Sequence, residues 1–361
     1  MRTLERITVT GYKSIRELRD FELGNINVLI GANGAGKSNF LSVIKLLKEL
    51  ARRRLQQFIA NEGYADAVLH FGRKATKEIQ IEFSTNEQHF RKYQATLIPL
   101  RKNTLLISKE RMSKPLNENE WDDFGGGREE SAIPEIEGVW GTFLADIFDF
   151  VEIYQFHDTS DAAPVKQHSH IFDSRSLNSN ASNLASLLYR LKNHQPVFYN
   201  RIVKTIQLAA PFFDDFLLYS EPDNPDRIRL RWRHKKSDDN WDVSQLSDGT
   251  LRFICLTTLL LQPNSPDLII IDEPELGLHP YAMGLLVEML RSVATKSQVI
   301  ISTQSTAMVS QFFPEEVIVV DQEKDASVFR RLNSEELKVW LEDYSLGEIW
   351  EMNLVGGRPR R

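Results

Sequence analysis

The chain has 361 residues, of which 42% are hydrophobic and 26% charged, and its 44 basic and 50 acidic residues give a formal net charge of −6. This composition is ordinary for a globular protein and argues against a wholly basic nucleic-acid coat. The single cysteine, Cys255, excludes a disulfide framework and a cysteine-rich metal site. Neither a signal peptide nor a run of about 18 apolar residues is recognisable, so we expect a soluble cytoplasmic chain with no membrane partner.

The N-terminal part combines strand and helix patterns. Apolar side chains alternate from Leu4 to Thr10, and a second strand is expected at Asn25 to Ile30, before a helix that continues to about Ala60. This helix has a basic stretch that could meet a phosphate backbone, although a solvated helix face is the simpler interpretation. The stretch comprises Lys45, Lys48, Arg52, Arg53 and Arg54.

The middle of the chain changes from strands to helices. Alternating apolar residues between Ile79 and Ile107 predict an antiparallel meander with one buried face, and the polar segment from Ser113 to Glu137 is predicted to be a surface loop. Val151 to Gln155 is expected to be a short strand. Asn183 to Ala209 has helical spacing, and Pro196 should divide it into two helices.

The C-terminal half contains short, unbroken apolar strands between helices, which is typical of a buried parallel sheet with right-handed crossovers. The basic tail, Gly356 to Arg361, is expected to be frayed. The expected elements are a strand at Ile228 to Trp232, a helix at Leu251 to Leu261, a strand at Leu268 to Ile271, a helix around Leu285 to Val293, strands at Val299 to Ser302 and Val317 to Val320, and a helix at Ser334 to Trp350.

A glycine-rich segment between the second strand and the first helix carries the strongest motif. Gly31, Gly36, Lys37 and Ser38 satisfy the P-loop pattern G-x-x-x-x-G-K-[ST]. In such a loop the backbone amides and the helix N-terminus hold phosphates, the lysine reaches the β and γ oxygens, and the serine contacts Mg2+. The alternative is a glycine-rich turn that happens to precede a helix. The residues expected to bind the nucleotide here are Asn33, Gly34, Gly36, Lys37, Ser38 and Asn39.

Two acidic residues follow the strand at Leu268 to Ile271. Ligands bind at the carboxyl ends of strands in open α/β sheets, so Asp272 could complete a Mg2+ shell and Glu273 could polarise an attacking water. Taken alone, the pattern is weak evidence for a catalytic pair, because many buried strands end in an acidic cap or turn residue.

A third element, Leu246-Ser-Asp-Gly-Thr250, precedes the helix at Leu251 to Leu261. The Ser247 hydroxyl and the Gly249 amide are expected at a helix N-terminus, where an anion is favoured. By itself the segment could be no more than a helix start.

Together and in this order, the three elements resemble the ABC-type ATPase family, with its P-loop, LSGGQ-like signature and Walker B strand ending in Asp-Glu. Gln155 resembles the Q-loop glutamine, and Leu276-Gly-Leu-His-Pro280 resembles the D-loop. The opening Ile7-Thr-Val-Thr-Gly-Tyr-Lys-Ser14 and the segment Asp272 to Pro280 narrow the resemblance to the branch of RecF, SMC-type heads and OLD-type ATPases, whose members include stand-alone AAA-domain ATPases.

The sequence departs from the family pattern at three points. Asp248 and Thr250 stand where the fuller signature has Gly and Gln. Gln304 stands at the position of the switch histidine, and a glutamine can hydrogen-bond a γ-phosphate but cannot take up a proton near neutral pH. There is no sustained heptad pattern of the kind that forms SMC arms, and too few residues follow Gln304 for the nuclease domain of an OLD-type protein.

The resemblance implies an α/β P-loop NTPase with the architecture of an ABC-ATPase head: a mainly parallel core sheet, an antiparallel β subdomain and a helical lobe. We expect one ABC-type ATPase domain over residues 1–361. Its parts would be a nucleotide-binding core with the β subdomain at 1–150 and 251–332, a helical signature lobe at 151–250, and a C-terminal helix and tail at 333–361.

The same resemblance implies an ATP phosphohydrolase that uses ATP and Mg2+. Two chains would pair head to tail, as a homodimer or within a higher oligomer, with each ATP between Gly31 to Ser38 of one chain and Ser247 to Gly249 of the other. Lys37 would contact the phosphates, Glu273 would orient water and Gln304 would sense the γ-phosphate. The metal would be served by Ser38, Gln155 and Asp272.

Such a dimer is expected to act with DNA or a nuclease partner in DNA repair or defence against foreign DNA. Two other functions are compatible with the sequence. One is a nucleotide-binding scaffold with negligible turnover, which Gln304 favours, and the other is an energising subunit of a membrane transporter, because one fold serves many functions.

Overall fold

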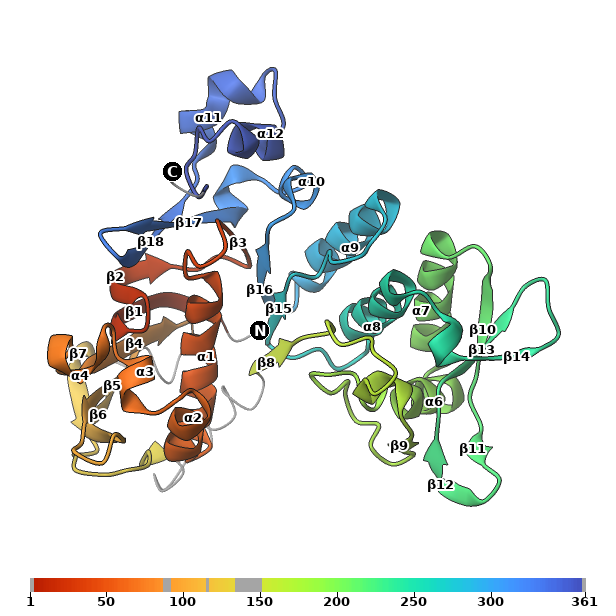
Figure 1. Cartoon of the computed structure of the whole chain (residues 1–361), viewed down its shortest axis with the longest axis horizontal. Coiled ribbons are helices and arrows are strands. Elements are labelled where there is room, and N and C mark those ends of the chain that lie inside the picture. The colour runs from red at the N-terminus through yellow and green to blue at the C-terminus, as the bar shows by residue number, and fades with distance from the viewer. Residues whose placement is uncertain (1–2, 87–91, 115–116, 134–150, 359–361) are drawn as a thin grey trace. The chain divides into compact units, whose positions relative to one another are not determined.

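The computed structural model describes residues 3–86, 92–114, 117–133 and 151–358. They belong to two compact units: unit 1 is Met1–Glu152 with Ser297–Arg361, and unit 2 is Ile153–Lys296. Unit 1 is thus assembled from both ends of the chain, coloured red to yellow and blue in Figure 1, and the continuous middle segment of the sequence forms unit 2. Residues 251–296 group with this middle segment, and the predicted division into functional domains stays a prediction.

The first sheet of unit 1 is antiparallel, with the strand order β2-β1-β4-β5-β6-β7. The predicted meander is confirmed, because β4, β5 and β6 are successive neighbours and β4 alternates buried with half-buried side chains. The strands are β1 (Leu4–Tyr12), β2 (Ile15–Glu22), β4 (Ile79–Thr85), β5 (Lys92–Pro99), β6 (Leu105–Lys114) and β7 (Asn117–Asp123).

Two of these strands escaped the sequence analysis. In β2 the buried Ile15 and Leu18 are three positions apart, so no alternation was visible, and pairing with β1 fixes the strand. The prediction of a loop from Ser113 to Glu137 was wrong at β7, a polar strand that pairs with β6. Residues 115–116 and 134–137 of that predicted loop lie outside the described residues.

The second sheet of unit 1 has parallel strands at its centre. β3 (Ile26–Ile30) lies between β16 (Gln298–Thr303) and β17 (Val317–Glu323), parallel to both, while β18 (Ala326–Arg331) pairs with β17 antiparallel. All residues of β3 and β16 are buried. Together with the antiparallel sheet and the helices of unit 2, these strands confirm the predicted α/β class.

Two long helices predicted for unit 1 are each interrupted. The first ends at Ala51 because Arg53 adopts a left-handed conformation with φ 54°, and a new helix starts at Leu55. At the C-terminal end Ser345 caps a second helix with Glu348, so the predicted helix from Ser334 to Trp350 is two helices. The helices of unit 1 are α1 (Lys37–Ala51), α2 (Leu55–Asn61), α3 (Ala65–Val68), α4 (Gly72–Ala75), α10 (Thr306–Val309), α11 (Ser334–Leu341) and α12 (Leu346–Glu351).

Unit 2 contains helices and two small antiparallel sheets, β10-β13-β14 and β11-β12-β9. The predicted break at Pro196 is confirmed, whereas the strand predicted from Ile228 to Trp232 was wrong: it is divided between β12 and β13, which belong to different sheets. The elements of this part of the chain are β8 (Val151–Tyr154), β9 (Ser169–His170), α6 (Leu184–His194), α7 (Pro196–Ala209), β10 (Phe213–Leu217), β11 (Ser220–Glu221), β12 (Asn224–Ile228), β13 (Arg231–His234), β14 (Asn240–Asp242), α8 (Asp248–Leu261), β15 (Leu268–Asp272) and α9 (Pro280–Val293).

The C-terminal segment is ordered up to residue 358, where a frayed tail was expected. Gly357 is buried and its amide donates to Asp321 Oδ2 at 3.2 Å, and the Val355 carbonyl accepts from Arg330 Nη2 at 2.6 Å. A Cβ on Gly357 would lie 3.4 Å from the Gly31 Cα atom, so this segment packs against the start of the P-loop. Residues 359–361 lie outside the described part of the chain.

Candidate functional site

The P-loop begins at the buried carboxyl end of β3, in unit 1. Gly31 has φ 152°, and a Cβ there would come within 2.2 Å of the Val320 carbonyl oxygen. Gly36, the residue before α1, has φ 117°, and its Cβ would come within 2.0 Å of Ser327 Oγ. Both positions therefore require glycine. A Cβ on Gly34, in contrast, would have no neighbouring atom within 4 Å, so the loop is open at this residue.

Lys37 is 6% exposed and folds back over the loop. Its Nζ donates to the Gly31 carbonyl oxygen at 2.6 Å and to the Ala32 carbonyl oxygen at 3.2 Å. The first turn of α1 has no acidic residue, while Asn33, Gly34 and Ser38 are exposed. An ammonium group, an unneutralised helix N-terminus and an open glycine loop together suit a phosphate.

Two serines from opposite ends of the chain support this loop. Ser327 Oγ donates to the Ala35 carbonyl oxygen at 2.5 Å and lies 2.7 Å from Ser14 Oγ, and the Ser327 amide donates to the Ser14 carbonyl oxygen at 2.7 Å. Ser14 Oγ also accepts from Asn39 Nδ2 at 2.7 Å. Ser327 carried no recognisable signal in the sequence, because its role arises only when β18 and the P-loop meet.

Gln304 follows β16 and is exposed. Thr303 pairs with Ile30 across the parallel strands β16 and β3, so Gln304 and Gly31 are the next residues along two neighbouring strands. The structure thus brings the predicted γ-phosphate sensor to the edge of the sheet where the P-loop starts.

The other predicted site residues lie in unit 2. Asp272 ends β15, and Glu273 follows it with φ 45°. Gln155 is exposed just after β8, and its amide donates to the Ser179 carbonyl oxygen at 3.1 Å. The predicted roles of all the site residues in binding one nucleotide stay predictions.

The signature-like segment begins a helix, as predicted, although α8 starts within the segment at Asp248. Ser247 Oγ accepts from the Thr250 amide at 3.3 Å and caps α8. Gly249 lies against the D-loop segment: its Cβ would come within 2.1 Å of the Gly277 carbonyl oxygen. Only a glycine permits this approach.

A pocket of about 820 Å³ lies beside the P-loop helix and was not predicted from the sequence. It reaches Asn39, directly after Ser38, and also involves Lys13 and Arg73. Phe71 is 68% exposed at its wall, and its ring packs edge-on against His70 with 4.6 Å between the ring centroids.

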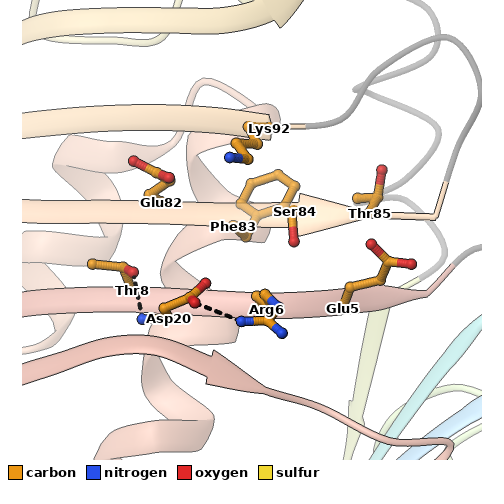
Figure 2. A pocket seen from close by; sticks show the side chains of 9 residues that line it. All are labelled: Glu5, Arg6, Thr8, Asp20, Glu82, Phe83, Ser84, Thr85 and Lys92. Atoms are coloured by element: carbon orange, nitrogen blue, oxygen red, sulfur yellow. Dashed lines mark hydrogen bonds and ion pairs between the residues drawn. The ribbon is translucent and has the colours of Figure 1, made fainter. Parts of the chain in front are cut away.

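Figure 2 shows a smaller pocket, of about 290 Å³, over β1 and β4. Arg6 Nη1 donates to Asp20 Oδ2 at 2.5 Å there, and Thr8 Oγ1 accepts from the Asp20 amide at 2.9 Å. None of the predicted site residues lines this hollow.

The basic stretch, which begins on α1 and continues through the turn before α2, is not a continuous cationic face. Lys48 is 7% exposed, and its Nζ lies 2.7 Å from Glu152 Oε1. Lys45 Nζ lies 3.8 Å from Glu62 Oε1, and Arg54 Nε lies 3.8 Å from Glu49 Oε2. Lys48 in particular is unavailable to a phosphate backbone.

The fold and this arrangement define an ATPase domain of the ABC and SMC-head type. A crystal structure of an SMC head bound to the C-terminal winged-helix domain of ScpA superposes with a TM-score of 0.62 and 13% identity, over 93% of this chain and 99% of that one. The SMC head of Pyrococcus furiosus, bound to the C-terminal domain of ScpA, gives a TM-score of 0.58 and 14% identity, over 95% of this chain and 99% of that one. At these identities the likeness shows the fold alone.

Residues 26–139 and 141–310 match the family described as "AAA domain, putative AbiEii toxin, Type IV TA system", and the chain belongs to this family. Among curated proteins, the Nod factor export ATP-binding protein I of Rhizobium etli is 40% identical over 74 residues, 20% of this chain and 23% of that protein. The Old nuclease of Escherichia phage P2 is 33% identical over 108 residues, which cover 27% of this chain and 18% of that protein. The chain thus spans less than a quarter of these relatives.

Proposed function

We propose that this chain binds ATP with Mg2+ and hydrolyses it. The observation that carries the proposal is the geometry of the glycine-rich loop of unit 1: exposed Gly34 and Ser38, the Lys37 ammonium group and the start of α1, with Gln304 directly after the neighbouring strand β16. Hydroxyl, carboxylate and amide oxygens suit Mg2+, and we assign its binding to Ser38, Asp272 and Gln155. Glu273 would orient the attacking water, and Gln304 would contact the γ-phosphate.

The decisive variants are Lys37→Ala and Glu273→Gln. Lys37→Ala should weaken ATP binding by at least roughly tenfold, whereas Glu273→Gln should retain binding and lose turnover, because only the water-orienting carboxylate is removed. Calorimetric ATP titration and phosphate release measure the two effects. The assignment fails if the wild-type chain neither binds nor hydrolyses ATP.

The pocket beside Asn39 supports a place for the nucleoside part of ATP. It adjoins the phosphate loop, and Phe71 offers an exposed aromatic face on which a base could stack. Lys13 and Arg73 also line this pocket, and both are already paired with carboxylates: Lys13 Nζ lies 2.7 Å from Glu62 Oε2, and Arg73 Nη2 lies 2.7 Å from Asp66 Oδ2.

We further propose an ATP-gated dimer in which Ser247 to Gly249 of one copy closes on the nucleotide held by Gly31 to Ser38 of another. The start of α8 and the glycine at 249 support this role, whereas Asp248 in the first turn opposes an anion there. Glu273→Gln with ATP should double the molar mass in light scattering. An unchanged monomer mass with bound ATP would contradict the head-to-tail dimer.

DNA or a nuclease partner is the proposed target of the dimer, in DNA repair or defence. The similarity to a phage Old nuclease supports it, as does the toxin–antitoxin description of the family. The basic stretch supports it less than the sequence suggested, since Lys48 is buried. Two measurements test the nucleic-acid role: the rate of ATP hydrolysis with and without DNA, and DNA binding after joint substitution of Arg52, Arg53 and Arg54. If DNA does not change the rate and the substitutions do not change DNA binding, the nucleic-acid role is refuted.

Two specific observations favour other functions. Gln304 cannot take up a proton, which favours a scaffold that binds ATP without turnover. Such a scaffold would show tight ATP binding and negligible phosphate release. The local match to an export ATP-binding protein favours a transporter subunit, which should co-purify with an integral membrane protein. Among the residues that the structure describes, no helix is both long enough and apolar enough to cross a bilayer.

A further inference from the structure

Arg252 lies on α8, in the second turn after Ser247, and its guanidinium group donates three hydrogen bonds to main-chain carbonyl oxygens. Nε donates to Phe156 at 3.1 Å, Nη2 donates to His157 at 2.9 Å, and Nη1 donates to Leu276 at 3.0 Å. Phe156 and His157 come directly after Gln155, and Leu276 begins the D-loop segment. One guanidinium group therefore joins three chain segments within unit 2.

Two further contacts tighten the same cluster. The His157 ring nitrogen Nε2 lies 2.8 Å from the Asp272 carbonyl oxygen, which ties the segment after Gln155 to the end of β15. Gly249 packs against the Gly277 carbonyl oxygen, and Gly277 itself has φ 75°. The start of α8, the segment after Gln155, the end of β15 and the D-loop segment thus meet around Arg252.

We infer that Arg252 is a positioning residue for ATP hydrolysis, an inference that rests on the proposed function. The planar guanidinium has five N–H donors in a fixed fork, so it can hold three carbonyl oxygens at set directions, whereas a lysine ammonium is a single point on a flexible stem. Through these bonds Arg252 fixes two segments relative to the start of α8: the one directly after Gln155 and the one that follows Glu273. It holds these groups in place without contacting the nucleotide.

Arg252→Lys is the test variant, because it keeps the positive charge and removes the fork. Arg190→Ala is the matched control: Arg190 belongs to α6 of the same unit, its Nη1 donates to the Ser174 carbonyl oxygen at 3.1 Å, and neither residue is one of the predicted site residues. Steady-state kcat and the Kd for ATP are measured for the wild-type chain and both variants, with the thermal midpoint as a check on folding.

We expect Arg252→Lys to lower kcat at least roughly tenfold, because small misplacements of reacting groups cost this much. The Kd for ATP should stay within about twofold, since the phosphate loop is not contacted by Arg252, and Arg190→Ala should change neither constant. An unchanged kcat in Arg252→Lys, or an equal loss in Arg190→Ala, would overturn the inference.

Hydrogen exchange separates this inference from the ATPase proposal. In Arg252→Lys, amides of residues 155–158 and 276–278 should exchange faster than in the wild-type chain and in Arg190→Ala. If the wild-type chain has no turnover while these amides still loosen in Arg252→Lys, the ATPase proposal fails and the positioning contact stands. Unaltered exchange at both segments would refute the positioning role, whatever the rate of hydrolysis.

Discussion

Ser327 Oγ donates a hydrogen bond of 2.5 Å to the Ala35 carbonyl oxygen, so β18 holds the middle of the P-loop. Ser327→Ala would remove this hydrogen-bond partner from the Ala35 carbonyl and from Ser14 Oγ. We expect this loss to lower the free energy of unfolding by about 1–3 kcal/mol. We expect a lower free energy of unfolding in denaturant titrations and weaker ATP binding by calorimetry. Ser292→Ala, at an exposed serine of α9, should alter neither quantity. Equal behaviour of the two variants would contradict the supporting role of Ser327.

Gly36 and Gly34 should respond differently to alanine. At Gly36 the new Cβ would meet Ser327 Oγ at 2.0 Å and Ser14 Oγ at 2.8 Å, in addition to the backbone strain at φ 117°. At Gly34 the Cβ would meet open space, so only the left-handed conformation at φ 80° is penalised, by about 1–2 kcal/mol. Denaturation without nucleotide should therefore show the larger loss of stability for Gly36→Ala. The reverse order would show that the loop relaxes away from the serines.

Phe71→Ala should weaken ATP binding by roughly tenfold and leave the binding of inorganic tripolyphosphate unchanged, because the ring is proposed to contact the base and not the phosphates. Calorimetric titrations with both ligands measure the difference. Phe172→Ala is a suitable control, since Phe172 is another exposed aromatic residue, 78% exposed and in unit 2. A parallel loss for ATP and tripolyphosphate would place the base elsewhere.

Lys48 and Glu152 should be energetically coupled. Burial lowers the pKa of the Lys48 ammonium group, and the contact with Glu152 acts in the opposite direction, so either partner alone would leave a poorly compensated charge. We expect Lys48→Met and Glu152→Gln each to destabilise the chain, and the double variant to lose at least about 1 kcal/mol less than the sum. Additive losses in a denaturant double-mutant cycle would exclude the coupling.

The sequence by itself determined the class of the protein and the identity of its main motifs. The P-loop, the strand that ends at Asp272 and the helix after Ser247 were all predictable, because each depends on residues close together in the chain: an apolar run, a turn and a helix start. The meander from β4 to β6 and the break at Pro196 were predictable for the same reason, through alternation and the geometry of proline.

The tertiary structure alone decided how these motifs are supported. Ser14 and Ser327 are 313 positions apart and meet only when β18 folds beside the P-loop, and the three carbonyl partners of Arg252 come from two distant segments. Strand β7 is polar and forms because β6 offers its hydrogen-bonding edge, while the burial of Lys48 turns an apparent basic face into an ion pair. Such contacts depend on which distant segments pack together, and local patterns of polarity in the sequence do not predict this packing.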